Sequence, residues 1–219
     1  MSNQDIASCR LYGFIDAAYI GDRDPVTLTG QLIDGGVDII QIRAKGRTTW
    51  QIIDLGLRIV ELARSRGVPV VVNDDIEAAF EIRADGVHLG QEDWAAIAPE
   101  DRRRFLSPVK ILGISTHSLD QALKAERDGA TYIGVGPVFA TGTKPSAAPV
   151  GLDFVRQAAR QVHIPWFAIG GITMERLPQV IEAGAGRVAV VSAILNAGDV
   201  TAAARQFKTV LASNPSVTS

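Results

Sequence analysis

Short apolar segments alternate with amphipathic segments along the whole chain, and this alternation restricts the fold more than any other feature. Eight apolar segments are expected to form strands: RLYGFID, VDIIQIR, VPVVVN, GVHLG, VKILGIS, TYIGVGP, IPWFAIGG and RVAVVSA. Between them, apolar residues recur at three- and four-residue spacing, most clearly over 49–65, 118–128, 152–162 and 174–183; this spacing predicts helices. Strands that are apolar throughout are typical of parallel strands covered on both faces.

Glycines mark the predicted joints between a helix and the next strand, where a left-handed helix end favours a residue without Cβ. They lie in DGGVDII, SRGVPVVV, RADGVHLG, RDGATYIG and EAGAGRVAV. Eight such units predict a single (β/α)8 TIM barrel over residues 1–219, with frayed termini at 1–9 and 212–219. An open doubly wound sheet is the alternative, but FIDAAYIGDRDP, after the first strand, lacks the G-x-G-x-x-G expected there.

The composition is that of an ordinary globular protein, with 47% hydrophobic and 21% charged residues and a net charge of -2. Because no basic stripe is present, we expect no nucleic acid partner. No apolar run approaches the roughly 20 residues of a membrane helix, and MSNQDIASCR is too polar for a signal peptide. We therefore expect a cytoplasmic protein with no membrane partner. A homo-oligomer is compatible with this composition. Cys9 is the only cysteine, which excludes an internal disulfide.

Polar residues follow nearly every predicted strand, at the end where barrel enzymes carry their active sites. The candidates are Gln41, Arg43, Lys45, Asn73, Asp74, Asp93, Ser115, Thr141, Thr143, Lys144, Gly171, Val191 and Ser192. If the barrel closes, all of these residues converge on one rim.

Two carboxylates follow adjacent strands of this barrel. Asp74 alone is better explained as a helix cap, a role that Asp75 fits equally well, and Asp93 has the same simple explanation. As a pair facing several cations, Asp74 and Asp93 instead predict a Mg²⁺ site completed by substrate oxygens.

The basic residues suit a diphosphate. Strand alternation points Gln41, Arg43 and Lys45 the same way, and a guanidinium, an ammonium and a divalent ion together match a diphosphate. Taken alone, each of Arg43, Lys45 and Lys144 is better explained as a solvated surface charge.

A second anion site is predicted after the later strands. The loop 136–150 is long and contains three prolines, which indicates a functional lid and not a flexible linker. Gly170 and Gly171 form a tight turn or, together with Ser192, a backbone cradle for a monophosphate.

The histidines carry weaker signals. His117, beside Ser115 and Thr116, has the chemistry of a general base, but no acid lies at a spacing that marks a catalytic triad. His88 lies within a strand and is expected to be a hydrogen-bonded core residue.

The quoted motifs also carry a resemblance to a known family. QIRAK, VNDDIEAAFEIRADGVHLGQED, LGISTHS, YIGVGPVFATGTKPSAAPVGL, AIGGIT and RVAVVSAI occur in this order over residues 11–196. In this combination they resemble the thiamine-phosphate synthases, which are small (β/α)8 barrels. The resemblance implies a transferase that joins a hydroxymethylpyrimidine diphosphate to a thiazole phosphate, carboxylated or not, and releases pyrophosphate.

The resemblance also implies roles for the candidate residues. Contacts to the pyrimidine diphosphate fall to Gln41, Arg43, Lys45, Asn73, Ser115 and Lys144, with Arg43, Lys45, Ser115 and Lys144 as the catalytic set. Mg²⁺ falls to Asp74 and Asp93. The thiazole phosphate falls to Thr141, Thr143, Gly171, Val191 and Ser192. In this family the diphosphate is thought to leave first, and the thiazole nitrogen then captures a pyrimidinyl carbocation.

Two other functions fit the same barrel. One is a thiazole tautomerase, an isomerase that lacks a complete diphosphate and metal set; the other is a phosphate-binding module without turnover, which has no need of paired carboxylates. Both are disfavoured because the diphosphate and metal set is intact here.

Overall fold

The chain folds into a closed barrel of eight parallel strands, seen in a computed structural model that describes residues 5–106, 110–143 and 147–214. Each strand pairs with the next along the chain, and the first pairs with the eighth. The strands are β1 Leu11–Asp16, β2 Ile39–Arg43, β3 Val70–Asn73, β4 Gly86–Leu89, β5 Ile111–Thr116, β6 Tyr132–Val135, β7 Trp166–Ile169 and β8 Val188–Ala189. The predicted barrel is confirmed, and the open sheet is excluded.

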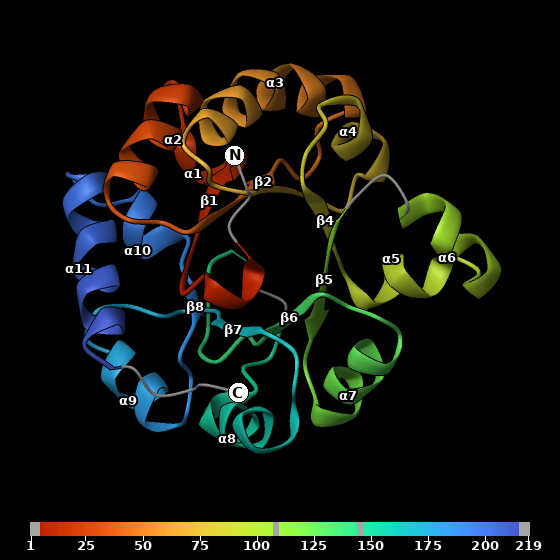
Figure 1. The fold of residues 1–219 in the computed structure, drawn as a ribbon. Helices are drawn as coiled ribbons and strands as arrows, with labels where there is room; N and C mark the ends of the chain where they lie inside the picture. Colours follow the sequence, from red (N-terminus) through yellow and green to blue (C-terminus); the bar gives the residue numbers. More distant parts are fainter. Residues whose placement is uncertain (1–4, 107–109, 144–146, 215–219) are drawn as a thin grey trace.

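Helices surround the ring of strands, as Figure 1 shows. They are α1 Ala17–Ile20, α2 Pro25–Asp34, α3 Thr49–Ser65, α4 Ile76–Glu81, α5 Gln91–Ala96, α6 Pro99–Leu106, α7 Leu119–Arg127, α8 Gly151–Gln161, α9 Leu177–Glu182, α10 Ser192–Leu195 and α11 Val200–Ala212. Within the described residues, none of these helices is both long and apolar enough to cross a membrane.

The predicted glycine joints are correct at four of five positions. Gly36, Gly67, Gly129 and Gly184 have φ between 72° and 106° at the ends of helices. The interpretation of Gly86 as a helix end is wrong, because Gly86 is the first residue of β4. A Cβ there would lie 2.1 Å from the carbonyl oxygen of Ile111, so close strand approach explains this glycine.

Fraying was predicted for residues 1–9; residues 5–9 are instead ordered, and residues 1–4 lie outside the described part of the chain. Ile6–Ser8 forms a short 3-10 helix, η1, which Asp5 caps by accepting a hydrogen bond from the Ala7 amide. Ile6 and Cys9 are buried and pack with barrel-interior residues such as Tyr12 and Phe167. In Figure 1, η1 (red) lies across the middle of the ring. The apolar interior of the barrel explains the difference, because η1 covers it at the end opposite the polar rim.

The C-terminal boundary also differs from the prediction. Helix α11 continues to Ala212, and the Asn214 carbonyl accepts a 2.5 Å hydrogen bond from the Arg10 guanidinium. Residues 215–219 lie outside the described part of the chain.

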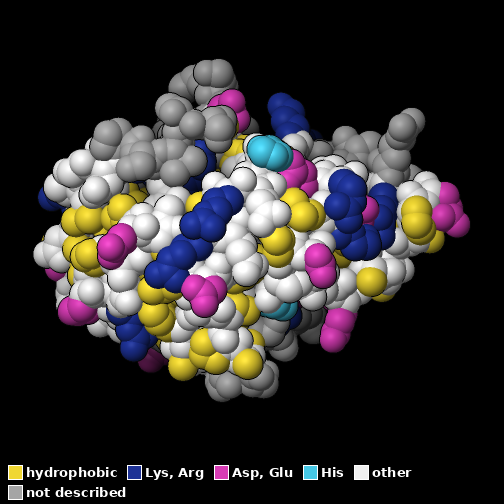
Figure 2. All heavy atoms as spheres, turned by 90° about the horizontal axis from the view of Figure 1, so that it is seen from below, with side chains coloured by type: hydrophobic (Ala, Val, Ile, Leu, Met, Phe, Trp, Pro, Cys, Tyr) yellow, Lys and Arg dark blue, Asp and Glu magenta, His cyan; other side chains and the backbone are white. Residues whose placement is uncertain are grey.

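Surface charges are mixed on the face shown in Figure 2, where Lys and Arg side chains are interspersed with Asp and Glu. Opposite charges therefore offset each other locally on this face, in keeping with a net charge of -2.

Candidate active site

One cavity of about 590 Å³ collects residues from the carboxyl ends of the strands and from the loops that follow them. Twelve of the predicted site residues line it: Gln41, Arg43, Lys45, Asn73, Asp74, Asp93, Ser115, Thr141, Thr143, Gly171, Val191 and Ser192. The thirteenth, Lys144, lies outside the described residues. The closed barrel thus brings together side chains that are as far as 151 positions apart in the sequence.

Asp75, not Asp74, caps helix α4. Its carboxylate accepts hydrogen bonds from the Ala78 amide (2.8 Å) and the Thr49 hydroxyl (2.8 Å). Asp74 has a left-handed backbone with φ of 64°, a conformation that Asp tolerates better than most residues. Its side chain lines the cavity, forms an ion pair with Lys45 and accepts a 2.7 Å hydrogen bond from the Asn73 amide group. The chain therefore turns at Asp74, which leaves one acid for the helix and one for the cavity.

Asp93 both caps its helix and lines the cavity. It occupies the third position of α5, and its Oδ2 accepts a 3.3 Å hydrogen bond from the Gly90 amide. The capping explanation is therefore correct as far as this one oxygen is concerned, and it does not prevent the carboxylate from facing a ligand.

The two carboxylates fit a hard divalent cation only with help from substrate and water. Among the described residues, no group of three or more histidine, cysteine or acidic side chains is placed to hold a metal by itself. Mg²⁺ is commonly bound by one or two carboxylates together with phosphate oxygens and water, and Asp74 and Asp93 in one cavity match that donor set.

Arg43 is held by Asp16, a residue that the strand-end analysis missed. The Arg43 Nη1 donates to Asp16 Oδ2 at 2.7 Å, and the Asp16 carboxylate is 1% exposed. The other Asp16 oxygen accepts a 3.0 Å bond from the Ala18 amide at the start of α1. The available signal was position: Asp16 is the last residue of β1, the same place that identified the other candidates.

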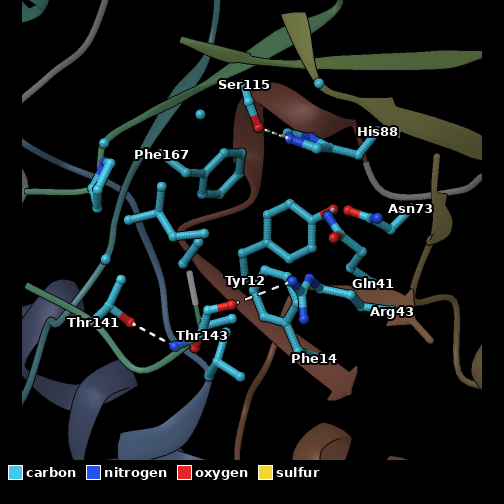
Figure 3. A pocket seen from close by; sticks show the side chains of 18 of the residues that line it. Tyr12, Phe14, Gln41, Arg43, Asn73, His88, Ser115, Thr141, Thr143 and Phe167 are labelled. Atoms are coloured by element: carbon cyan, nitrogen blue, oxygen red, sulfur yellow. Dashed lines mark hydrogen bonds between the residues drawn. The ribbon is translucent and has the colours of Figure 1, made fainter. Parts of the chain in front are cut away.

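The loop after β6 is anchored to Arg43 and to helix α1. Thr143 shares a 2.9 Å hydrogen bond with the Tyr19 hydroxyl, and its carbonyl accepts a 3.4 Å bond from Arg43. The Thr143 amide donates to the Thr141 hydroxyl at 3.2 Å. Figure 3 shows the Arg43 and Thr141 contacts to Thr143. This loop therefore closes one wall of the cavity through contacts with α1 and β2.

Gly170 and Gly171 form the tight turn proposed from the sequence, and they also line the cavity. Their φ values are 100° and 64°. A Cβ on Gly170 would lie 2.4 Å from Pro137, and one on Gly171 would lie 2.6 Å from the Ala140 carbonyl oxygen. The loop after β6 therefore packs so closely against this turn that neither position has room for a side chain. Ser192 begins α10 and lines the same cavity.

His88 is a buried, hydrogen-bonded residue, as predicted. Its two ring nitrogens lie 2.8 Å from the Tyr132 hydroxyl and 2.9 Å from the Ser115 hydroxyl. Burial lowers its pKa to about 4, so the ring is neutral near pH 7. His88 also lines the cavity, and Figure 3 shows its contact with Ser115.

His117 lines the cavity too, with its Nδ1 hydrogen-bonded to the Gly136 carbonyl. A carbonyl can only accept, so Nδ1 carries the proton and Nε2 is the acceptor of the neutral ring.

The fold and the cavity are those of a barrel enzyme that handles phosphorylated small molecules. A family model described as thiamine monophosphate synthase matches residues 11–194. The thiamine-phosphate synthase of Chloroflexus aurantiacus is 45% identical over 212 residues, covering 96% of both chains. That of Shouchella clausii is 42% identical over 197 residues, covering 90% of this chain and 93% of its own.

A solved structure agrees. The thiamine phosphate pyrophosphorylase from Pyrococcus furiosus is similar with a TM-score of 0.85 and 31% identity, covering 96% of this chain and 98% of that one. The chain therefore belongs to the thiamine monophosphate synthase family. It is a transferase of thiamine biosynthesis with thiamine-phosphate synthase activity.

Proposed function

We propose that this enzyme joins 4-amino-2-methyl-5-(diphosphooxymethyl)pyrimidine to a thiazole phosphate, carboxylated or not, and releases pyrophosphate. One observation carries the proposal: a single cavity is lined by two acids, by basic residues, and by hydroxyls together with a glycine turn, which come from different strand ends and loops. Such a cavity offers separate places for a diphosphate and a monophosphate.

The pyrimidine diphosphate is assigned to the side formed by β2, β3 and β5. Gln41, Arg43, Lys45, Asn73 and Ser115 supply polar groups there, and Lys144, outside the described residues, is assigned to the same substrate. Arg43 offers a forked donor and Lys45 a compact charge, a combination suited to adjacent phosphate groups.

The thiazole phosphate is assigned to the side formed by the loop after β6 and the ends of β7 and β8. Thr141, Thr143, Gly171, Val191 and Ser192 line this side. Hydroxyls and backbone N–H groups can hold a monophosphate without a full positive charge.

The reaction proposed is a dissociative displacement. The bond between the pyrimidine methylene carbon and the diphosphate oxygen breaks, and its electron pair leaves with the diphosphate. The thiazole nitrogen then forms the new bond to that carbon with its own lone pair. No proton is transferred in these two steps, so no strong base is required. With a carboxylated thiazole, the bond between C2 and the carboxylate breaks afterwards, CO2 leaves, and C2 takes up a proton from water to give thiamine phosphate.

The side chains act on charge and position. Arg43 and Lys45 stabilise the charge that develops on the departing diphosphate, together with Lys144. Ser115 donates a hydrogen bond within the same site, and the loop after β6 positions the thiazole and excludes water. Asp74 and Asp93 would hold Mg²⁺. When bound, this ion would neutralise part of the diphosphate charge.

The direct test is incubation of the enzyme with both substrates and Mg²⁺. We expect thiamine phosphate and pyrophosphate in equal amounts, and little of either with excess EDTA. Isomerised thiazole without pyrophosphate would instead indicate a tautomerase, and phosphate binding without turnover would indicate a binding module. Full activity in EDTA would remove the metal role from Asp74 and Asp93.

We further propose a cytoplasmic location. Cys9 is a free, buried thiol, and an unpaired cysteine with no disulfide in the described residues suits a reducing compartment.

A further inference from the structure

Five cavity-lining side chains from five strands form one continuous hydrogen-bonded chain. Gln41 Nε2 donates to Tyr12 Oη (2.8 Å), Tyr12 Oη lies 2.8 Å from Tyr132 Oη, and His88 connects Tyr132 (2.8 Å) to Ser115 (2.9 Å). We call these five residues the polar chain. Its two ends, Gln41 and Ser115, are proposed substrate contacts, whereas the three middle residues have no role in the mechanism above.

Packing holds the middle of the polar chain in place. Tyr12 and Tyr132 are each 1% exposed. The Phe167 ring packs edge-on against both, with centroid distances of 5.2 and 5.6 Å. At Gly113, a Cβ would lie 2.2 Å from the Tyr132 ring and 2.5 Å from His88 Nδ1. A glycine at this position of β5 therefore provides the room in which Tyr132 and His88 meet.

The proton positions along the polar chain follow from its first donor. The Tyr12 oxygen accepts a hydrogen bond from Gln41, so the Tyr12 hydroxyl proton is donated to Tyr132. Without that acceptor the buried hydroxyl would lack a hydrogen-bond partner, which costs about 1–3 kcal/mol of stability. If Tyr132 accepts the Tyr12 proton in this way, its own proton points to His88 Nδ1, 2.8 Å away. The proton of the neutral imidazole then lies on Nε2 and is donated to Ser115.

The direction of hydrogen bonding along the polar chain determines whether each end residue presents a donor or an acceptor to a ligand. The Ser115 oxygen already accepts from His88, so its hydroxyl proton is free to be donated. Gln41 uses its amide nitrogen on Tyr12, which directs its carbonyl oxygen elsewhere as an acceptor. The residues at the two ends of the polar chain thus have opposite and defined hydrogen-bonding character.

We propose that Tyr12, Tyr132 and His88 are positioning residues that fix the orientation of the Gln41 amide and thereby select a 4-aminopyrimidine ring over a 4-oxopyrimidine ring. The inference rests on the proposed function, because it concerns the pyrimidine substrate of that same site. An amino group donates to the Gln41 carbonyl, whereas a 4-oxo oxygen would face it with a second acceptor.

Two substitutions break the polar chain at different distances from Gln41. Tyr12→Phe removes the acceptor that holds the amide, so the amide is free to rotate. Tyr132→Phe leaves Tyr12 without an acceptor for its proton, and Tyr12 can then donate to a reversed Gln41 amide. Tyr132 therefore acts on Gln41 only through Tyr12, a relation that loss of packing alone does not produce.

The experiment compares dissociation constants of the 4-amino and the 4-oxo pyrimidine diphosphates by calorimetry, a measurement that needs no turnover. We expect the wild-type enzyme to favour the amino ring by at least about tenfold, and both tyrosine variants to lose most of that preference. Thr29→Val is the matched control. It removes a buried hydroxyl bonded within α2 to the Pro25 carbonyl, away from the cavity, and should keep the wild-type preference.

Equal weakening of both ligands in the tyrosine variants, with their ratio unchanged, would overturn the proposal and reduce the polar chain to a structural role. A wild-type enzyme that binds both rings equally, or neither ring, would overturn it as well. Turnover of the 4-amino substrate with the thiazole phosphate is measured separately. A clear preference without turnover would therefore count against the proposed reaction and not against the polar chain.

Discussion

Arg43 lines the cavity and is paired with Asp16, and this ion pair fixes the orientation of the guanidinium group. Both Asp16 oxygens are occupied, one by Arg43 and the other by the Ala18 amide. A guanidinium fixed in this way needs little reordering when it meets a phosphate. Sequence reasoning identified Arg43 but not Asp16, because the pairing depends on which strand neighbours β2 in the closed ring: Asp16 lies opposite Arg43 in the strand register.

Asp16→Ala should lower kcat/KM by roughly ten- to a hundredfold, since Arg43 loses the partner that orients it. Asp16→Asn, which keeps an acceptor oxygen, should lose less. Asp34→Ala is the control, because Asp34 also pairs with an arginine, Arg66, but both side chains are about half exposed. Steady-state kinetics with circular dichroism measures the effect. An Asp16→Ala enzyme as active as the control would show that Arg43 needs no such support.

The adjacent acids Asp74 and Asp75 allow a sharper comparison. Asp74→Ala and Asp93→Ala should each lower turnover by orders of magnitude, and Lys144→Ala should do the same. Asp75→Ala should cost about 1 kcal/mol of stability because the helix loses its cap, but it should leave turnover within a few-fold. A pyrophosphate-release assay distinguishes these effects, and near-normal turnover of Asp93→Ala would count against its assigned role.

His88 predicts a pH dependence of stability. Its pKa is about 4 in the folded protein and 6.5 in the reference state, and burial is the cause. The unfolded chain therefore binds the proton first as the pH falls. The stabilisation due to a neutral His88 is complete above about pH 6.5 and is lost progressively towards pH 4, by up to about 3 kcal/mol.

Urea unfolding at several pH values tests this prediction, with His88→Gln as the comparison. The difference in unfolding free energy between wild type and variant should shrink as the pH falls from 6.5 to 4. A difference that does not change with pH would show that His88 titrates normally in the folded state.

At the scale of elements, the residues at the strand ends could be predicted from the sequence, but helix η1 could not. The end-of-strand rule identified residues such as Asn73 and Ser115, which line the cavity. Helix η1 was missed because three residues with one buried isoleucine carry no periodic pattern. Its order comes from the open end of the barrel, which exists only once the ring has closed.

Ile6→Ala should therefore destabilise the protein by about 2 kcal/mol, because Ile6 is 7% exposed and packs with the barrel interior. Ser8→Ala, at an exposed position of the same helix, should change stability by less than about 0.5 kcal/mol. Chemical denaturation compares the two variants. Equal, small effects would mean that η1 contributes little to closing the barrel.

At the scale of the whole molecule, the alternation of strands and helices was enough to predict the ring, and the ring was enough to predict that the candidate residues gather in one cavity. Twelve predicted residues line one cavity because a closed parallel barrel has a single carboxyl edge. The polar chain across the interior could not be predicted, since it depends on the strand register that places His88 and Tyr132 on either side of Gly113.

The molecule is proposed to use this convergence to bind a metal-complexed diphosphate with acids and bases from separate strands. Calorimetric titration of pyrophosphate, with and without Mg²⁺, measures that coupling in the wild type and in the Asp74→Ala/Asp93→Ala double variant. Mg²⁺ should tighten pyrophosphate binding at least about tenfold in the wild type and leave it nearly unchanged in the double variant. Equal tightening in both proteins, or none in either, would contradict the assignment of these two acids to the metal.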